Sequence, residues 1–467
     1  MTQTVALPLW LLILILLFAA VTFASHFLFP SVRWFFRKRA ERLIARLNTR
    51  LQRPIEPFKL ARRYDMIQRL IYDPQVTEAI VEHAHENNVP ENVAFEKARD
   101  YAREIVPSFS ATAYFTFGTR LARWISRSLY RIKLGSFDRS ALDKIDPDAA
   151  VIFVMNHRSN MDYVLVTYLV SQTSALSYAV GEWARIWPLS SMIRAMGAYF
   201  IRRRNRGGLY RKVLARYVQL AVQGGVTQAF FPEGGLSLTG RVGEPKLGLL
   251  NYILSGWQPG GRDVIFVPVA LNYDHVLEDR FLIKADKTGV RRFRPPLGDV
   301  LRGLGGHFLK RLTLRFKGFG TASVSFGAPL SLAAEVAENP AMDAEVTAQV
   351  LMARVRAVMP VLPVPLVSTV LIDGVPRSEA TICRDVEALL ETLRTKDAIL
   401  PRREPEAITK AALAVLSERG LVKEDHGTYA VIPGEVDVLA YYARSIEHLF
   451  AQEANAAAPI ADLDVAE

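Results

Sequence analysis

The central part of the chain, residues 146–335, alternates short apolar runs with segments of helical periodicity. The apolar runs are AVIFVM, LSYAV, AYFI, TQAFF, DVIFVPVAL and ASVSFG. Alternation of this kind is typical of an α/β domain with a mostly parallel sheet flanked by helices. In such domains ligands bind beyond the carboxyl ends of the strands. The turns that follow the strands are therefore the first places to look for chemistry.

Both flanks of this domain are predicted to be helical. Residues 32–145 are basic and contain no convincing strand, and residues 336–452 return to helical periodicity. Within the second flank, ITKAALAVLSERGLVKEDHGTYAVI indicates a helix, a stop at Gly420 and a short hairpin, as in winged-helix modules. We expect this unit to serve packing rather than DNA binding. Residues 453–467 are Ala-rich and acidic, which predicts a disordered tail.

The N-terminus carries an uncharged run that is long enough to cross a bilayer. Residues 5–24 contain no charged side chain, and the first Lys or Arg of the chain is Arg33. A cleaved signal peptide is the competing interpretation, but no basic segment precedes the run and no small-x-small site follows it. We therefore predict an uncleaved transmembrane helix within residues 1–31.

The segment after this anchor is strongly basic. Residues 31–63 hold 11 Lys or Arg against 2 Glu. The positive-inside rule then places the bulk of the protein on the cytoplasmic side of the inner membrane. The net charge of +11 indicates attraction to anionic membrane lipids. Nucleic-acid binding is the other usual interpretation of such a charge, and the anchor argues against it.

Residues 119–133, TRLARWISRSLYRIK, predict an amphipathic helix. Its basic residues recur at intervals of three and four, and an apolar stripe lies opposite them. The basic set is Arg120, Arg123, Arg127 and Arg131, and the stripe is Leu121, Trp124, Ile125, Leu129 and Ile132. One interpretation is an interfacial helix whose apolar side lies among acyl chains while its arginines face phosphates. The alternative is a helix packed on the domain with a solvated basic face.

The chain contains one cysteine, Cys383, which excludes an internal disulfide and a Cys-based metal site. Its surroundings predict an amphipathic helix, so a small buried hydrophobic side chain is the expected role. His83 and His85 have no partner ligands in the sequence around them, and we expect them to be solvated. No cofactor and no metal are expected.

The turn after AVIFVM contains His157 and Asp162. On a regular helix two residues five apart lie about 140° apart, so they can meet only if the helix begins after His157, with Ser159 as N-cap and Asp162 at N3. A carboxylate fixes the imidazole tautomer, and the other ring nitrogen can then take a proton from an attacking hydroxyl. The alternative is that SNMD is a capping box in which Asp162 only satisfies a backbone N–H.

Three later segments add basic, acidic and glycine residues. The run GAYFI is followed by four arginines that suit either a phosphate or a solvated loop, namely Arg202, Arg203, Arg204 and Arg206. In FFPEGGLSLTGR, Glu233 follows a strand, and Gly234 and Gly235 permit close backbone approach. Pro268 within VIFVPVAL indicates an edge position or a bulge beside a pocket.

Taken in this order, four blocks resemble the glycerol-3-phosphate acyltransferase family and its lysophosphatidate and dihydroxyacetone-phosphate acyltransferase relatives. They are NHRSNMD, with the pattern His-x4-Asp, then GAYFIRR, FPEGGLS and FVPVAL, all within residues 150–272. LAYYARSIEHLF, near the end, also resembles the C-terminal segment of bacterial membrane-bound members. The resemblance implies a glycerolipid acyltransferase fold.

The resemblance also implies an activity and a set of site residues. Acyl-CoA or acyl-carrier protein would donate an acyl chain directly to the sn-1 hydroxyl of glycerol 3-phosphate, in phospholipid biosynthesis. His157 would act as general base and Asp162 would orient it. The substrate-binding set that it implies is Arg202 and Arg203 for the acceptor phosphate, Glu233, Gly234, Gly235 and Ser237 for the acceptor site, and Pro268 for the acyl pocket.

The third block departs from the family pattern. Members that acylate glycerol 3-phosphate usually read Glu-Gly-Gly-Arg-Ser-Arg, whereas this chain has Leu236 and Leu238 at the arginine positions. Either Arg241 and Lys246 compensate, or the acceptor is lysophosphatidate or another glycerol phosphate. A more distant alternative is a membrane-tethered lipid- or DNA-binding protein with a decayed active site.

Overall fold

The computed structural model describes residues 8–19, 38, 39, 42, 44–171, 173–181, 189–202, 207–289 and 318–451. These residues group into two compact units. The first comprises residues 1–55 with 172–174, and the second comprises residues 56–171 with 175–467. All the side chains discussed below as site residues belong to the second unit.

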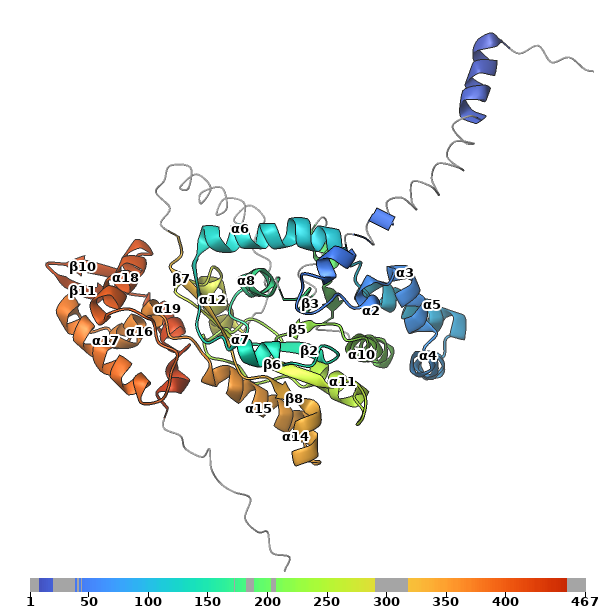
Figure 1. Ribbon diagram of the computed structural model, residues 1–467. Helices are drawn as coiled ribbons and strands as arrows, with labels where there is room; N and C mark the ends of the chain where they lie inside the picture. The colour runs from blue at the N-terminus through green and yellow to red at the C-terminus, as the bar shows by residue number, and fades with distance from the viewer. Residues whose placement is uncertain are drawn as a thin grey trace, which may run out of the picture. The chain divides into compact units, whose positions relative to one another are not determined.

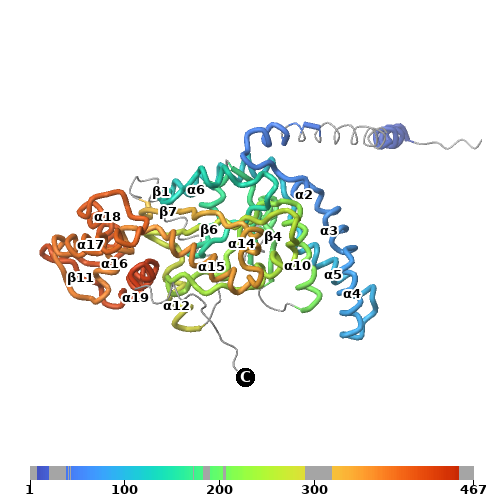
Figure 2. Tube along the Cα trace, turned by 60° about the horizontal axis from the view of Figure 1, so that its bottom comes forward, coloured from blue at the N-terminus to red at the C-terminus, as the bar shows by residue number. Residues whose placement is uncertain are grey.

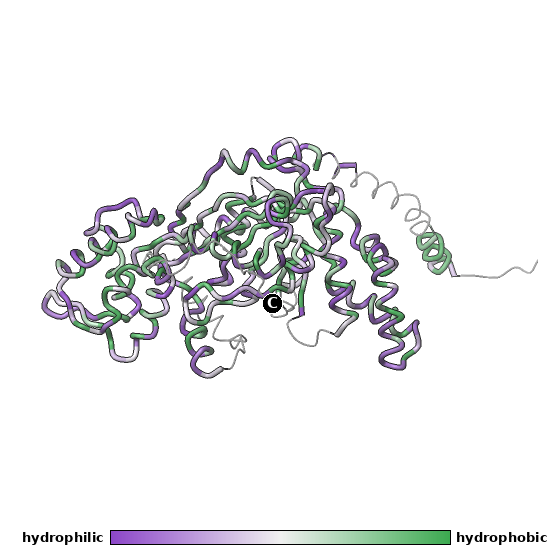
Figure 3. The backbone as a smooth tube through the Cα atoms, turned by 90° about the horizontal axis from the view of Figure 1, so that it is seen from below, coloured by the Kyte–Doolittle hydropathy of each residue, from purple (hydrophilic) through white to green (hydrophobic). Residues whose placement is uncertain are grey.

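In the first unit, residues 9–19 are helical and carry exposed apolar side chains. In Figure 3 the backbone of this helix has the green colour of hydrophobic residues. Within the described residues, no helix combines the length and the apolar character needed to cross a membrane. Residues 5–7 and 20–24 of the predicted anchor lie outside the described part of the chain, as does the predicted tail, 453–467.

The described residues of the second unit form an eight-stranded sheet, shown in Figure 1. Its order is β1-β7-β6-β2-β5-β3-β4, with β8 paired to β6. Among these strands every pair is parallel except β6 with β7 and β6 with β8. The strands are β1 (Arg131–Leu134), β2 (Ala150–Met155), β3 (Ser177–Gly181), β4 (Tyr199–Ile201), β5 (Gln228–Phe230), β6 (Val264–Tyr273), β7 (Thr321–Phe326) and β8 (Leu330–Ser331). Each predicted apolar run contains one strand, and the α/β prediction is confirmed.

Helices cover both faces of the sheet because the strands are apolar on both sides. In β2, Val151 and Phe153 belong to one hydrophobic cluster, while Ile152 and Val154 belong to the other. The first cluster includes side chains of α8 (Met161–Val170) and α6 (Thr119–Leu129). The second includes those of α10 (Gly208–Gln223), α11 (Gly248–Gly256) and α15 (Ala344–Ala357). Figures 1 and 2 show these two helical layers on either side of the strands.

The predicted helix over residues 119–133 is too long, because α6 ends at Leu129 and β1 begins at Arg131. β1 pairs in parallel with β7, about 190 residues further along the chain, from Arg131 with Thr321 to Leu134 with Val324. A four-residue strand whose partner is so distant has no local signal to distinguish it from the end of an amphipathic helix. The prediction that residues 32–145 contain no strand is therefore wrong at this point.

The expected edge position of Pro268 is also wrong, because β6 lies between β2 and β7. The proline is tolerated for a different reason. The Pro268 carbonyl accepts a hydrogen bond from Gly327 N (2.8 Å), so its nitrogen faces the side of β6 that carries β8 and β7. On that side the partner changes from β8, paired up to Phe266, to β7, paired from Val269. The missing N–H therefore falls in a gap between two ladders.

Helices dominate the two flanks of the sheet. Towards the N-terminus lie α2 (Pro57–Leu60), α3 (Arg63–Ile71), α4 (Pro74–Glu86), α5 (Glu91–Ile105) and a π-helical segment, Ala113–Gly118. The shorter helices around the sheet are α7 (Arg139–Asp143), α9 (Leu189–Ala195), α12 (Asp279–Thr288) and α14 (Leu332–Glu338). After α15 come α16 (Pro363–Leu371), α17 (Glu379–Arg394), α18 (Pro405–Glu418) and α19 (Val436–Ala443).

The expected helix, glycine stop and hairpin occur in the C-terminal region. α18 ends before Gly420, which has φ +66°, and the hairpin consists of β10 (Val422–Asp425) and β11 (Thr428–Val431). β11 also pairs with β9 (Arg377–Ser378), so these strands form a second, antiparallel sheet. Cys383 lies on α17 and is half-buried rather than buried as expected.

Candidate active site

The structure brings His157 and Asp162 together at the carboxyl end of β2. The imidazole Nδ1 lies 2.9 Å from Asp162 Oδ2, and both side chains are almost completely buried. His157 also stacks on Phe231, with ring centroids 3.9 Å apart. A carboxylate at Nδ1 keeps the ring proton there, so Nε2 is the basic nitrogen. Among the described residues no hydrogen bond involves Nε2.

Asp162 holds the loop as well as the imidazole. Its Oδ2 accepts hydrogen bonds from the backbone nitrogens of Arg158 (2.8 Å) and Ser159 (3.0 Å) in addition to His157 Nδ1. The capping and catalytic interpretations therefore describe the same carboxylate. The predicted capping box is present, because Ser159 Oγ accepts a hydrogen bond from Met161 N (3.1 Å) and Ser159 N donates one to Asp162 Oδ2. The regular helix α8 begins at Met161, although Asn160 already has helical backbone angles (φ −62°, ψ −16°) and makes no capping hydrogen bond of its own.

Two residues that were missed in the sequence support this loop: Tyr273 at the carboxyl end of β6, and Glu278 in the segment that follows. Tyr273 donates its hydroxyl to Asp162 Oδ1 (2.6 Å). Glu278 accepts hydrogen bonds from Ser159 Oγ (2.8 Å) and from Asn160 N (3.2 Å) and Nδ2 (2.9 Å). Burial raises the pKa of both groups. β6 runs parallel to β2, so their carboxyl ends share one edge. The polar letters NYDHVLED, which begin at the end of β6 and continue past it, are the signal that could have identified these residues.

We expect Tyr273→Phe to lower kcat about 10-fold, because a hydrogen bond to a charged group contributes about 1.5–3 kcal/mol. KM should change little, since the hydroxyl contacts Asp162 rather than a substrate. Steady-state kinetics across pH should show the acidic limb of the profile, where the general base becomes protonated, displaced in the variant. Tyr429→Phe, on the hairpin strand β11, is the matched control. Equal kinetics for Tyr273→Phe and the parent would contradict a positioning role.

Glu233 ties the turn after β5 to His157. Its Oε1 accepts a hydrogen bond from His157 N (2.8 Å), and its Oε2 accepts one from Gly243 N (3.0 Å). The His157 carbonyl in turn accepts a hydrogen bond from Ser237 N (2.8 Å). Burial raises the pKa of Glu233 to about 7, against the opposing effect of the two N–H donors and of Arg158. This carboxyl group positions the loop that carries the base.

The raised pKa of Glu233 predicts that stability falls as pH rises. The pKa of Glu233 is 4.5 in the unfolded chain and about 7 in the folded one. Between these two pH values the folded state holds a proton that the unfolded state has lost. The stabilisation from this proton is therefore fully present below pH 4.5 and is lost as the pH rises to about 7. Raising the pH through this window should cost about 3 kcal/mol of unfolding free energy, at 1.36 kcal/mol per pKa unit. Denaturant unfolding from pH 4.5 to 8 checks this. Glu233→Gln should remove most of the slope, and an unchanged slope would contradict the assignment.

The glycine-rich turn places a lysine stem against its backbone. Gly234 has φ +67°, a conformation that favours glycine, and a Cβ there would lie 2.9 Å from Cδ of the flexible Lys246 side chain. Ser237 Oγ donates to the Arg241 carbonyl (2.6 Å), which closes the turn. Leu236 and Leu238 are half-buried and pack against the hydrophobic cluster on the α8 face of the sheet. They are packing residues here.

The predicted cationic ligands are only partly gathered at this site. Arg202 follows β4, three strands from β2 in the sheet order, which corresponds to about 14 Å at 4.8 Å per strand. Its guanidinium makes two hydrogen bonds to Glu104 (2.9 and 2.7 Å), which raise its pKa. Arg241 is half-exposed and pairs with Glu447 (2.9 Å). Arg203, Arg204 and Arg206 lie outside the described residues.

Arg158, also missed in the sequence, is the largest fully buried side chain beside the dyad. One of its nitrogens, Nη1, donates to the Gly240 carbonyl, and its guanidinium lies 4.8 Å from the ring centroid of Tyr441 on α19. Gly240 has φ +91°, and a Cβ at this residue would overlap the Tyr441 carbonyl oxygen. The loop after β2, the loop after β5 and the C-terminal region therefore meet next to His157.

Comparison with known proteins finds two family models. The family described as "Acyltransferase" matches residues 136–272, which include His157 and Asp162. A second family, described as "Glycerol-3-phosphate acyltransferase C-terminal region", matches residues 306–462. The chain is thus similar to glycerol-3-phosphate acyltransferases in two separate regions.

Curated relatives carry the same family name. A glycerol-3-phosphate acyltransferase of Pasteurella multocida is 28% identical over 428 residues, which cover 84% of this chain and 51% of that protein. One from Pseudomonas syringae pv. tomato is 30% identical over 279 residues, which cover 59% of this chain and 32% of that protein. This chain thus spans about half or less of the curated relatives it matches.

Among solved structures, the crystal structure of the 1-acyl-sn-glycerophosphate (LPA) acyltransferase PlsC from Thermotoga maritima is similar to this chain, with a TM-score of 0.32. The two are 19% identical, and the match covers 52% of this chain and 76% of that one.

Proposed function

We propose that this protein transfers a fatty acyl group from acyl-CoA or acyl-carrier protein to the sn-1 hydroxyl of glycerol 3-phosphate, in phospholipid biosynthesis. The observation that carries the proposal is the contact of His157 Nδ1 with Asp162 Oδ2, which leaves Nε2 as the basic nitrogen. The name shared by the curated relatives supports the choice of acceptor.

The reaction follows from this geometry. His157 Nε2 takes the proton of the acceptor hydroxyl as its oxygen bonds to the thioester carbonyl carbon. The C–S bond then breaks, and the leaving thiolate takes the proton from the imidazolium, so the products are an ester and a free thiol. The Asp162 carboxylate stabilises the imidazolium that forms between these steps. The single cysteine of the chain, Cys383, lies on α17 and takes no part.

Acylation of lysophosphatidate or another glycerol phosphate is the second candidate, favoured by one observation. Leu236 and Leu238, at the positions where two arginines are expected, pack into a hydrophobic cluster. Arg202 and Arg241, two of the cations proposed to bind a phosphate, already pair with Glu104 and Glu447. Lys246 lies against Gly234 of the glycine-rich turn.

Acyl transfer assays with single acceptors test both candidates. The purified full chain is incubated with acyl-CoA or acyl-carrier protein and with glycerol 3-phosphate, lysophosphatidate or dihydroxyacetone phosphate, and products are identified by mass spectrometry. We expect 1-acylglycerol 3-phosphate from the first acceptor. A product only from lysophosphatidate supports the second candidate. If no acceptor gains a chain from either donor, both are wrong.

Attachment to the cytoplasmic side of the inner membrane is part of the proposal. It is supported by the uncharged run at residues 5–24, of which residues 9–19 are helical with exposed apolar side chains, and by the basic segment 31–63. Alkaline-carbonate extraction of membranes from expressing cells tests it. Release of the full chain into the supernatant would contradict an anchor.

A further inference from the structure

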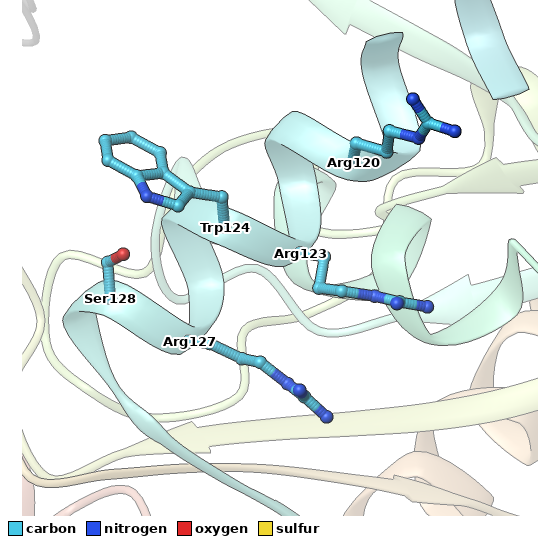
Figure 4. Close-up of a pocket in the computed structure, with 5 residues that line it drawn as sticks. All are labelled: Arg120, Arg123, Trp124, Arg127 and Ser128. Atoms are coloured by element: carbon cyan, nitrogen blue, oxygen red, sulfur yellow. The ribbon is translucent and has the colours of Figure 1, made fainter. Parts of the chain in front are cut away.

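Helix α6 presents a basic, partly aromatic face to solvent. Phe117, just before the helix, is 56% exposed and Trp124 is 59% exposed. The side chains of Arg120, Arg123 and Arg127 are exposed around them. Figure 4 shows these arginines, Trp124 and Ser128 lining one shallow hollow of about 350 Å³. Arg123 and Arg127 extend side by side from the same side of the helix.

The opposite face of α6 is firmly packed on the domain. Ala122 and Ser126 are buried, and Ile125 and Leu129 pack against the cluster that includes α8. Arg127 Nε donates to the hydroxyl of Tyr168 on α8 (3.1 Å), and the Arg123 guanidinium lies 5.5 Å from the same ring centroid. The predicted interfacial helix with Leu129 and Ile125 among acyl chains is therefore wrong. What faces outward is the basic side together with Trp124.

The chain segment that carries this face has charges of one sign only. Residues 105–137 contain no Asp or Glu, and they contain Arg131 and Lys133 besides the three arginines of α6. Guanidinium groups suit phosphate oxygens because their planar donors bind them in pairs. Tryptophan at a phosphate-rich surface is typical of the membrane–water interface, where its ring is apolar and its N–H is polar.

We propose that the α6 face, defined by Phe117, Arg120, Arg123, Trp124 and Arg127, docks on the head groups of anionic phospholipids. The arginines bind lipid phosphates, and Trp124 enters the head-group layer. This is a second membrane contact, separate from the predicted N-terminal anchor. It adds to the proposed function without depending on it, because lipid docking requires no turnover.

The docked face is linked to the active site through α8. α6 packs along α8, and the first turn of α8 carries Asp162. Arg127 reaches Tyr168 near the other end of the same helix. Docking through α6 thus fixes the orientation of α8, and with it the His157 loop, relative to the lipid surface into which an acylated product must pass.

A site-specific fluorescent label on the full chain tests the proposal. Cys383→Ala removes the native thiol, and Thr116→Cys places an environment-sensitive dye on exposed residue 116, one turn before Arg120. The protein is reconstituted into phosphatidylcholine vesicles with or without phosphatidylglycerol. We expect blue-shifted emission and protection from iodide only in the anionic vesicles. Added salt should reverse both.

Charge removal on α6 provides the second arm. Arg120→Gln, Arg123→Gln and Arg127→Gln together should lower the docked-to-undocked ratio on the order of 100-fold, from about 1 kcal/mol per arginine. The matched control removes three exposed charges from the C-terminal helices and hairpin, with Arg384→Gln, Lys410→Gln and Lys423→Gln. Circular dichroism melting shows whether each variant folds.

Two results would overturn the proposal. One is equal protection of the dye in neutral and anionic vesicles. The other is a folded α6 triple variant that stays as protected as the control triple. Because the dye reports position and not product, the outcome stands whichever acceptor the enzyme uses, and also if no acceptor is found.

Discussion

Replacing His157 with alanine should lower kcat by about 10²–10⁴-fold, the usual contribution of a positioned general base. The His157 imidazole contacts Asp162 through Nδ1. Its other ring nitrogen, Nε2, is therefore the one that can take a proton from an acceptor hydroxyl. KM for the acceptor should change far less than kcat. Single-turnover measurements of ester formation with acyl-CoA would separate the chemical step from product release.

The alanine variant needs a structural control, because His157 is 2% exposed and stacks on Phe231. His157→Gln keeps more of the buried volume and should be as inactive as the alanine variant while melting closer to the parent. His85→Ala removes an exposed imidazole from α4 and should leave activity unchanged. Cellular function that survives His157→Ala, with lipid docking intact, would favour the binding-protein alternative over catalysis.

The dyad could be predicted because its geometry is local. Only four residues separate His157 from Asp162, and a strand followed by an apolar helix fixes where the turn must fall. The capping box could be predicted for the same reason, since Ser159 Oγ accepts from Met161 N and Ser159 N donates to Asp162 Oδ2. Glu278, more than a hundred residues away, adds an acceptor for Ser159 and Asn160 that the four letters SNMD do not indicate.

The arrangement of the cations could not be predicted, because strand order is not a local property. The sequence places Arg202 after a strand, and the structure agrees, but β4 is the edge strand and β2 is central. The carboxyl ends of β2 and β4 lie on the same side of the sheet, but the two strands are not neighbours in it. The partner of Arg202, Glu104 on α5, is likewise 98 residues away in the chain. Which arginine faces the acceptor therefore depends on long-range packing.

The same limit explains the C-terminal contribution. Tyr441 of α19 lies over Arg158, and Tyr442 accepts a hydrogen bond from Val276 N (2.9 Å), in the loop that leads to Glu278. Tyr442 also donates to Asp279 (2.6 Å), which binds Arg419 as well. The C-terminal region is thus joined to both loops that hold the His157 turn. Nothing in LAYYARSIEHLF indicates this role without the fold.

Asp162→Asn should separate the two roles of this carboxylate. If Asp162 were only a helix cap, asparagine would serve, because its carbonyl oxygen can still accept the N–H groups of Arg158 and Ser159. If it orients and stabilises the imidazole, the loss of charge should lower kcat about 10³–10⁴-fold, as expected when the tautomer is no longer fixed. We expect the second result, with a melting temperature within a few degrees of the parent.

Asp162→Ala provides the contrast that makes this test decisive. It removes the acceptor for three donors and leaves the Tyr273 hydroxyl without its partner, and each buried unsatisfied group costs about 1–3 kcal/mol. It should therefore be both inactive and clearly less stable, by several kcal/mol in denaturant unfolding. An asparagine variant that is active and stable would show that the carboxylate serves only the fold. In that case His157 would have no charged partner to stabilise its protonated form, and the proposed proton transfer would be wrong.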